Sequence, residues 1–166
     1  TINYLMPINI NINLLKPVNG YLTYDYTPKF VWNGNGDSYL IQISKDSGFS
    51  IIYISNILSD TIYEKTNIQA NWFDFSETYY WKITAYKGGS QKTSNIYYFY
   101  IEKLIADFND DNYVDGTDAQ LLQRHWYFTL TSPNWDSKYD IFQSVPTRID
   151  YYDMTLFSLY WNKGNE

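Results

Sequence analysis

The chain has 166 residues, no cysteine, 20% aromatic residues and a net charge of −6. This length suits one large domain or two small ones, and the lack of cysteine excludes disulfides and thiol chemistry. No apolar run is long enough to span a membrane. Residues 1–104 contain eight acidic and eight basic residues, whereas residues 105–166 contain ten and four. The acidic second part favours a cation site there and argues against nucleic acid as a partner.

The chain opens with a segment of alternating hydrophobicity. Every even position from Ile2 to Leu14 is apolar, and most odd positions are polar. A period of two predicts an extended strand with one buried face. Two arrangements are open: residues 1–6 fold back onto their own domain, or they add as a strand to the sheet edge of another copy of the chain. In the second arrangement Ile2, Tyr4 and Met6 would fill pockets of that copy.

Short strands separated by turns follow from residue 14 to residue 104. The runs SYLIQIS, TYYWKITAY and NIYYFYIE are β-branched or aromatic, and NGNGD, KDSG and KGGS punctuate the region. This pattern predicts an antiparallel β-sandwich over residues 14–104, preceded by the extended strand of residues 1–13. LLKPVNG, the strand around Trp32 and the run Tyr79–Ala85 resemble the bacterial fibronectin type III-like family, which implies the same sandwich fold.

The aromatic residues neither support nor exclude carbohydrate binding. Trp32, Tyr80 and Trp81 lie within alternating strands, so we expect them in the core. Trp72 and Phe73 lie in the loop ANWFDF and are better candidates for exposed contacts, although residues in such loops more often fill the end of a sandwich. A sugar-binding accessory module that uses Trp72 is therefore one functional hypothesis.

The run DFNDDNYVDGTD has the ligand spacing of an EF-hand-type calcium loop. Its oxygen-bearing side chains stand at loop positions 1, 3, 5, 9 and 12: Asp107, Asn109, Asp111, Asp115 and Asp118. Calcium takes six to eight oxygen ligands, and Tyr113 at position 7 would add its backbone carbonyl. Asn112 occupies a position where glycine is usual, and asparagine tolerates a left-handed backbone well. The sequence therefore predicts calcium as the cofactor.

A second loop-and-helix pattern follows 35 residues later. The matching runs are Val114-Asp115-x-x-Asp118-x-x-Leu121-Leu122-x-x-x-Trp126 and Ile149-Asp150-x-x-Asp153-x-x-Leu156-Phe157-x-x-x-Trp161. Seven matches at one offset predict an internal duplication whose helices pack their apolar residues together. Over residues 105–162 the chain resembles a type I dockerin, a module of two calcium-loop-and-helix repeats. The resemblance implies that Asp107, Asn109, Asp111, Tyr113, Asp115 and Asp118 bind calcium.

The second repeat departs from the dockerin pattern. Phe142, Ser144 and Pro146 replace its first three ligands. Asp140 could complete a second metal site with Asp150 and Asp153 through a longer loop. The alternative is that Asp150 and Asp153 act only as turn and helix-capping residues.

Dockerins bind their partners through the pair of residues before the last loop aspartate. The resemblance therefore implies partner contacts at Gly116 and Thr117 in the first repeat, and at Tyr151 and Tyr152 in the second. The difference between the two pairs argues against symmetrical docking in two orientations. The exposed tyrosines could instead pack on the sandwich of the same chain.

Catalytic motifs are missing from the sequence. His125 is the only histidine, and there is no phosphate-binding loop or nucleophile motif, which argues against an enzyme. We expect a secreted or cell-surface structural protein that assembles with copies of itself through the leading strand. The alternative is an adaptor that docks to a cohesin-like protein in a polysaccharide-degrading complex. Neither hypothesis requires nucleic acid as a partner or insertion into a membrane.

Overall fold

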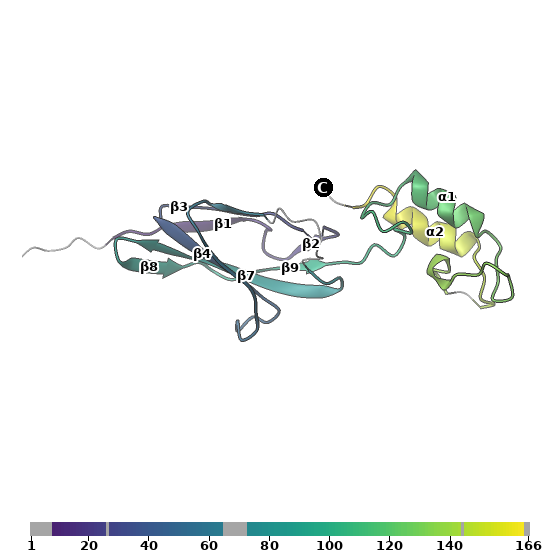
Figure 1. Ribbon diagram of the computed structural model, residues 1–166, viewed down its shortest axis with the longest axis horizontal. Coiled ribbons are helices and arrows are strands. Elements are labelled where there is room, and N and C mark those ends of the chain that lie inside the picture. Colours follow the sequence, from purple (N-terminus) through teal and green to yellow (C-terminus); the bar gives the residue numbers. More distant parts are fainter. Residues whose placement is uncertain (1–7, 26, 65–72, 144, 165–166) are drawn as a thin grey trace, which may run out of the picture. The chain divides into compact units, whose positions relative to one another are not determined.

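The computed structural model describes residues 8–25, 27–64, 73–143 and 145–164. The chain divides into two compact units, Thr1–Glu102 (unit 1) and Lys103–Glu166 (unit 2), so the division falls two residues before the expected one. Unit 1 is built of strands and unit 2 contains the two α-helices (Figure 1). No helix in the described ranges has the length and apolar character needed to cross a membrane.

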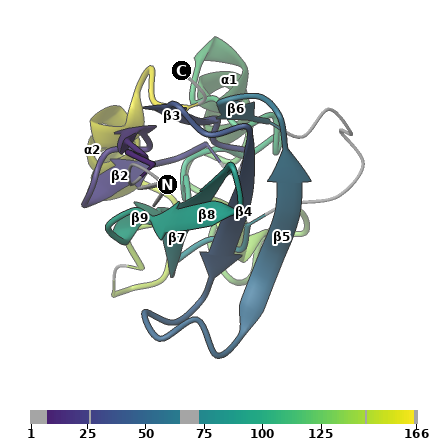
Figure 2. The same ribbon diagram turned by 90° about the vertical axis from the view of Figure 1, so that its left-hand side faces the viewer.

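Unit 1 contains two sheets (Figures 1 and 2). The smaller has the order β1-β3-β6: β1 (Ile12–Lys16), β3 (Phe30–Gly34) and β6 (Ile62–Tyr63). The larger has the order β2-β9-β7-β4-β5: β2 (Tyr21–Thr23), β9 (Tyr97–Ile101), β7 (Glu77–Lys87), β4 (Ser38–Ser44) and β5 (Ile52–Leu58). A further strand, β8 (Ser90–Thr93), pairs with β7.

The sandwich is not purely antiparallel, which corrects the expectation from the sequence. β2 pairs in parallel with β9, whereas the other pairs of described strands are antiparallel. The chain passes from β1 in the smaller sheet to β2 in the larger one, which places β2 beside a strand near the end of unit 1. The unit is therefore mainly β with mixed pairing, consistent with a β-sandwich.

Alternation along the strands produces the core of unit 1. β4 and β7 bury every second side chain, because successive side chains of a strand point to opposite faces of the sheet. One cluster joins side chains of both sheets, including Leu14, Phe30, Trp32, Ile41, Ile43, Tyr79, Trp81, Ile83 and Phe99.

Two of the expectations about aromatic residues change, those for Tyr80 and Phe73. Trp32 and Trp81 are buried as expected, but Tyr80 is only half-buried, because it alternates with Tyr79 and Trp81 on β7. Phe73 is 1% exposed and packs on Tyr79 at 4.5 Å between ring centroids, so it is a core residue and not a surface contact. Trp72 lies outside the described residues, and a sugar contact there stays a prediction.

The leading segment is described only from Ile8 onward. Ile10 and Leu14 are buried and Ile12 is half-buried, which confirms one buried face from Ile10 to Leu14, whereas Ile8 is 42% exposed. Strand β1 begins at Ile12 and pairs with β3. Residues 1–7, with Ile2, Tyr4 and Met6, lie outside the described residues, so strand addition to another copy stays a prediction.

Asp46 organises the turn between β4 and β5. Its Oδ1 accepts hydrogen bonds from the backbone N–H groups of Gly48 and Ser50, at 3.0 and 3.1 Å. Its Oδ2 accepts from the Ile51 N–H at 2.9 Å and from the Ser44 hydroxyl at 3.0 Å. These donors favour the charged carboxylate, with the Ile51 N–H first, and lower the pKa of Asp46 from 3.8 to about 2.

The lowered pKa makes unit 1 sensitive to acid. The folded-state pKa of Asp46 lies below its ordinary value of 3.8, so its contribution to stability is present above that pH. We expect this contribution to disappear as the pH falls from 3.8 through about 2. Thermal unfolding of unit 1 from pH 6 to pH 2 should show a weaker pH dependence in Asp46→Asn than in the native chain. Equal pH dependence in the two proteins would contradict the assignment.

Candidate metal centre

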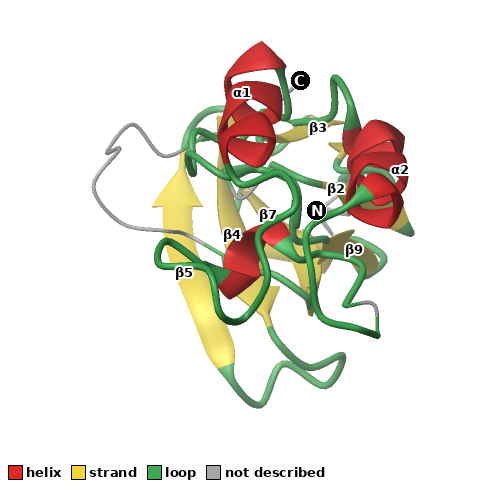
Figure 3. Cartoon of the chain, turned by 90° about the vertical axis from the view of Figure 1, so that its right-hand side faces the viewer, coloured by secondary structure: helices red, strands yellow, loops and turns green. Residues whose placement is uncertain are grey.

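Unit 2 is a small domain with two helices, α1 (Gly116–Arg124) and α2 (Tyr151–Tyr160), and a 3₁₀ turn, η1 (Ser137–Tyr139). The helices lie side by side (Figures 1 and 3). Its buried apolar residues are Leu104, Ala106, Phe108, Val114, Leu122, Tyr139, Ile149 and Phe157. Of the expected helix contacts, Leu122 and Phe157 are buried, Leu121, Trp126 and Leu156 are half-buried, and Trp161 is 45% exposed. The predicted burial of Trp161 is wrong: Trp161 is the C-cap of α2, and its ring packs on Phe157 at 5.8 Å between centroids but stays largely exposed.

The sequence did not single out Phe108 and Tyr139 as core residues. The Phe108 ring packs on Tyr139 at 4.8 Å and on Phe157 at 6.0 Å between centroids. His125 stacks on Tyr139 at 3.8 Å, and its Nδ1 lies 2.8 Å from the backbone carbonyl of Leu121. The only histidine is thus part of the packing of unit 2, as the sequence suggested.

Both helices begin with the same capping arrangement. Asp115 caps α1 by accepting the Thr117 N–H, and the Asp118 side chain accepts the Asp115 N–H in return. In the second repeat Asp150 and Asp153 form the same capping box at the start of α2. The reciprocal bonds satisfy backbone donors that have no partner within the helix.

The duplication also extends to the backbone beyond each helix. Four hydrogen bonds form two pairs related by the offset of 35 residues: Val114 N–H to Lys163 C=O and Asn162 N–H to Val114 C=O, matched by Ile149 N–H to Phe128 C=O and Tyr127 N–H to Ile149 C=O. Tyr127 and Asn162 both have left-handed backbones, with φ of 62° and 58°. Each loop therefore pairs with the segment that follows the other helix.

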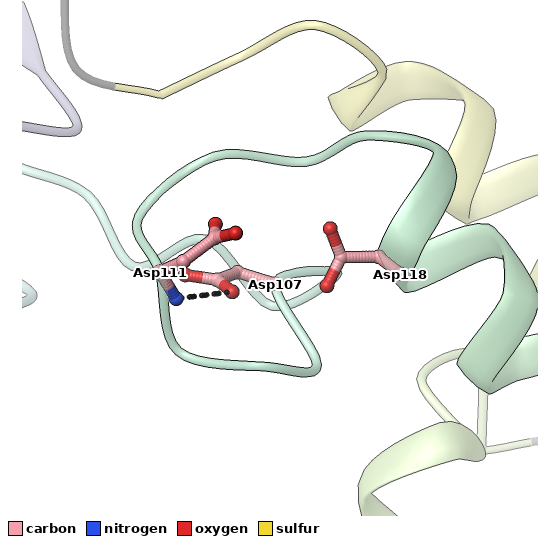
Figure 4. Close-up of side chains that lie close together, drawn as sticks. All are labelled: Asp107, Asp111 and Asp118. Atoms are coloured by element: carbon pink, nitrogen blue, oxygen red, sulfur yellow. Dashed lines mark hydrogen bonds between the residues drawn. The ribbon is translucent and has the colours of Figure 1, made fainter.

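Three carboxylates of the first loop converge at the start of α1 (Figure 4). One ligand atom from each of Asp107, Asp111 and Asp118 lies within 4.8 Å of the other two. Asp118 is fully buried, Asp107 is half-buried and Asp111 is exposed. Asp107 and Asp111 come from the loop, and Asp118 comes from the first turn of the helix, so the group joins the two elements.

Backbone hydrogen bonds fold the loop around this group. Asp107 accepts the N–H groups of Asp111 at 3.2 Å and Asn112 at 2.8 Å. Asn112 has a φ of 68°, which confirms that asparagine supplies the left-handed backbone expected at this position. Asp118 Oδ1 accepts the N–H groups of Phe108 and Asn109 at 2.6 and 3.2 Å, and its Oδ2 accepts that of Asp115 at 3.0 Å.

The electrostatics of the loop fit a divalent cation. Burial raises the pKa of Asp107, the negative charges of Asp118 and Asp111 raise it further, and the Asn112 N–H acts against this shift. The raised pKa means that burial and the neighbouring negative charges destabilise the ionised form of Asp107. A cation among the three carboxylates would relieve this repulsion. Hard carboxylate oxygens are the donors that calcium prefers, so the residues present fit calcium.

The other expected ligands, Asn109, Tyr113 and Asp115, are not part of this group of three converging carboxylates. The Asn109 side chain lies against Asp111, with Nδ2 at 2.7 Å from Asp111 Oδ2. Tyr113 forms a β-bridge with Gly164, and its N–H donates to Asp111 Oδ1 at 2.9 Å. Asp115 acts as the helix cap, which suits a loop position that often reaches calcium through water.

The described residues contain no second group of this kind, and Asp140, Asp150 and Asp153 do not converge. Asp150 Oδ2 pairs with Arg148 Nε at 2.6 Å, and its pKa is lowered, first by the Tyr152 N–H and then by Arg148. Asp153 accepts the N–H groups of Phe142 and Asp150. The geometry therefore gives the last two acids a capping role and lends no support to a second metal site.

The positions expected to contact a partner are exposed in both repeats. Gly116 and Thr117 are exposed, and Tyr151 and Tyr152 are 70% and 50% exposed. Phe142, at the position of the first ligand in the second repeat, stacks on Tyr152 at 5.1 Å between centroids. Phe142 and the two tyrosines form a surface that we call the aromatic cluster.

Gly164 provides a test of the pairing between the loop and the segment after α2. A Cβ at Gly164 would lie 2.3 Å from the Asn112 carbonyl oxygen and 2.8 Å from Tyr113 Cα, so the backbone would have to move. We expect Gly164→Ala to lower the free energy of unfolding of unit 2 by about 1–3 kcal/mol in denaturant titrations. Gly116→Ala is the matched control, because a Cβ there meets nothing within 4 Å. Equal stability of the two variants would contradict the role of the bridge.

Comparisons with known proteins add little to this geometry. No protein-family model matches the chain, and a search of curated proteins found no match. An Fn3-like protein from Clostridium thermocellum is 22% identical with a TM-score of 0.37, covering 52% of this chain and 90% of that chain. The alpha-L-rhamnosidase of Streptomyces avermitilis, complexed with L-rhamnose, is 8% identical with a TM-score of 0.38. That match covers 74% of this chain and only 14% of the enzyme.

Proposed function

We propose that this chain is a non-enzymatic extracellular assembly protein. In this proposal unit 1 is a fibronectin type III-like sandwich, and unit 2 is a dockerin-like module that calcium holds in its docking conformation. The convergence of Asp107, Asp111 and Asp118 at the start of α1 carries the proposal. The same carboxylates have no nucleophile or histidine beside them among the described contacts, which favours a structural ion over a catalytic one.

Asp118 links the loop to the helix in this mechanism. Bound calcium would supply positive charge to the three carboxylates. Asp118 already holds the N–H groups of Phe108, Asn109 and Asp115, so fixing its carboxylate fixes both ends of the loop. Val114 lies in the same loop and pairs with Asn162 and Lys163 after α2. An ordered first loop therefore also supports the end of the second helix.

The docking surface that we propose is the exposed side of α2. At four equivalent positions α2 carries a larger or a more apolar side chain than α1: Tyr151 for Gly116, Tyr152 for Thr117, Met154 for Ala119 and Leu159 for Arg124. Tyr151, Tyr152, Met154 and Leu159 are 70%, 50%, 37% and 62% exposed. Aromatic residues and methionine are enriched where proteins bind one another. The asymmetry favours one docking orientation, with a cohesin-like protein as the partner.

Binding of the purified chain to an immobilised cohesin domain tests this function. We expect binding in calcium, loss of binding in excess EGTA, and a loss of about tenfold or more when Tyr151 and Tyr152 are both changed to alanine. Changing Gly116 and Thr117 to alanine is the matched control and should leave binding nearly unchanged. Binding that persists in EGTA would contradict the calcium-dependent mechanism. A chain that does not bind cohesin but self-associates in calcium and not in EGTA would favour a structural subunit.

A further inference from the structure

Strand β5 forms one edge of the larger sheet and is unusually apolar for an edge. Ile52 and Ile57 of β5 are 41% and 71% exposed, and Ile51, directly before the strand, is 64% exposed. β4 lies on one side of β5, and no other described strand lies on its outer side (Figure 2). From Ile54 to Leu58 the pairing with β4 runs in unbroken register, so this part of the edge is regular.

The other edge strands in the described part of unit 1 have features that prevent further pairing. β2 and β6 have three and two residues, β8 contains Lys92, and β1 ends at Lys16 directly before Pro17. Short length, charge and proline are the usual protection of a sheet edge. β5 has seven residues, and no charged residue or proline occurs from Phe49 to Ser59. The edge of β5 is therefore suited to accept another strand.

The lack of charge on β5 favours an uncharged strand at this edge, and β5 of a second copy is such a strand. Residues 1–104 have equal numbers of acidic and basic residues, eight of each, and β5 has none. Two β5 edges can therefore approach without repulsion, whereas a charged peptide would find no opposite charge on the strand. Antiparallel pairing of a strand with itself also satisfies two-fold symmetry, in which each copy offers the same surface.

We propose that β5 pairs edge to edge with β5 of a second copy, in antiparallel orientation, so that the larger sheet continues across two chains. This interface lies in unit 1 and does not depend on calcium or on the docking role of unit 2. A dimer formed in this way carries two copies of unit 2 and would bind a surface with several partner sites more tightly than one copy would.

Sedimentation velocity over a range of concentrations tests the proposal on the full chain. We expect the native protein to dimerise both in calcium and in EGTA. Ile57→Lys places like charges on both edges and should weaken the dimer by about tenfold or more. Ile96→Lys is the matched control, because Ile96 is also an exposed isoleucine, 43% exposed, but lies between β8 and β9. Circular dichroism verifies that both variants are folded.

Hydrogen exchange locates the interface in the same samples. The amides from Ile54 to Leu58 should exchange more slowly as the dimer forms, while those of β8 remain unchanged. A protein that stays monomeric up to about 1 mM would overturn the proposal. A dimer that both lysine variants weaken equally, or that leaves the β5 amides unprotected, would overturn it as well, since the contact would then lie elsewhere. A dimer that is lost when residues 1–7 are removed would also overturn it, since the leading segment would then be the added strand.

Discussion

Replacement of Asp118 with alanine is expected to lower the free energy of unfolding of unit 2 by about 3–5 kcal/mol in calcium and to remove its stabilisation by calcium. The Asp118 carboxylate is fully buried and accepts the N–H groups of Phe108, Asn109 and Asp115. The variant loses one half of the capping box, leaves backbone donors unsatisfied and removes one of the three converging carboxylates. Guanidinium titrations with and without EGTA measure both effects.

Asp153→Ala is the matched control for this prediction. Asp153 is also fully buried, stands at the same position of the second capping box and accepts the N–H groups of Phe142 and Asp150. The Asp153→Ala substitution should lower the free energy of unfolding of unit 2 by about 2–4 kcal/mol, because these hydrogen bonds are lost. Calcium should still stabilise the variant. Calcium stabilisation that survives in Asp118→Ala, or disappears in Asp153→Ala, would contradict the assignment of the metal centre.

Phe30→Ala should lower the free energy of unfolding of unit 1 by about 3–5 kcal/mol. Phe30 is fully buried on the smaller sheet and contacts Trp81 and Phe99 of the larger sheet, at 5.2 and 5.6 Å between ring centroids. Removal of its ring leaves a cavity between the two sheets. The transition of unit 1 should move to lower denaturant concentration, while unit 2 keeps its response to calcium.

Tyr98→Ala provides the comparison within the same unit. Tyr98 is 45% exposed, and its nearest aromatic partner, Tyr80, is half-buried, with 6.1 Å between their ring centroids. We expect a loss of about 1 kcal/mol or less, because an exposed side chain leaves no cavity. A cost for Phe30→Ala as small as that for Tyr98→Ala would contradict a single core shared by both sheets.

Patterns in the sequence predicted the features that depend on residues close to one another along the chain. Alternation placed Trp32 and Trp81 in the core of unit 1, because the period of a strand fixes the face of each side chain. The spacing of the loop predicted the convergence of Asp107, Asp111 and Asp118, because a twelve-residue turn with a left-handed residue at Asn112 directs them to one point.

The features that the sequence did not reveal depend on distant contacts. The parallel pairing of β2 joins Tyr21 to Phe99, and a strand of three residues has no pattern that specifies a partner so far along the chain. Phe73 lies in a loop, where the sequence left an exposed contact and packing at the end of the sandwich both open, and it packs on Tyr79 in the core. Tyr139 is buried at the end of a 3₁₀ turn, where no helical or strand period marks its inward face.

Calcium binding to the purified full chain, measured by isothermal titration calorimetry, is the most direct test of the metal centre. One bound calcium ion per chain is expected for the native protein and for Asp153→Asn, and none for Asp107→Asn. A native chain that binds no calcium, or an Asp107→Asn variant that binds it as well as the native chain, would contradict the proposal that the carboxylates at the start of α1 hold the ion.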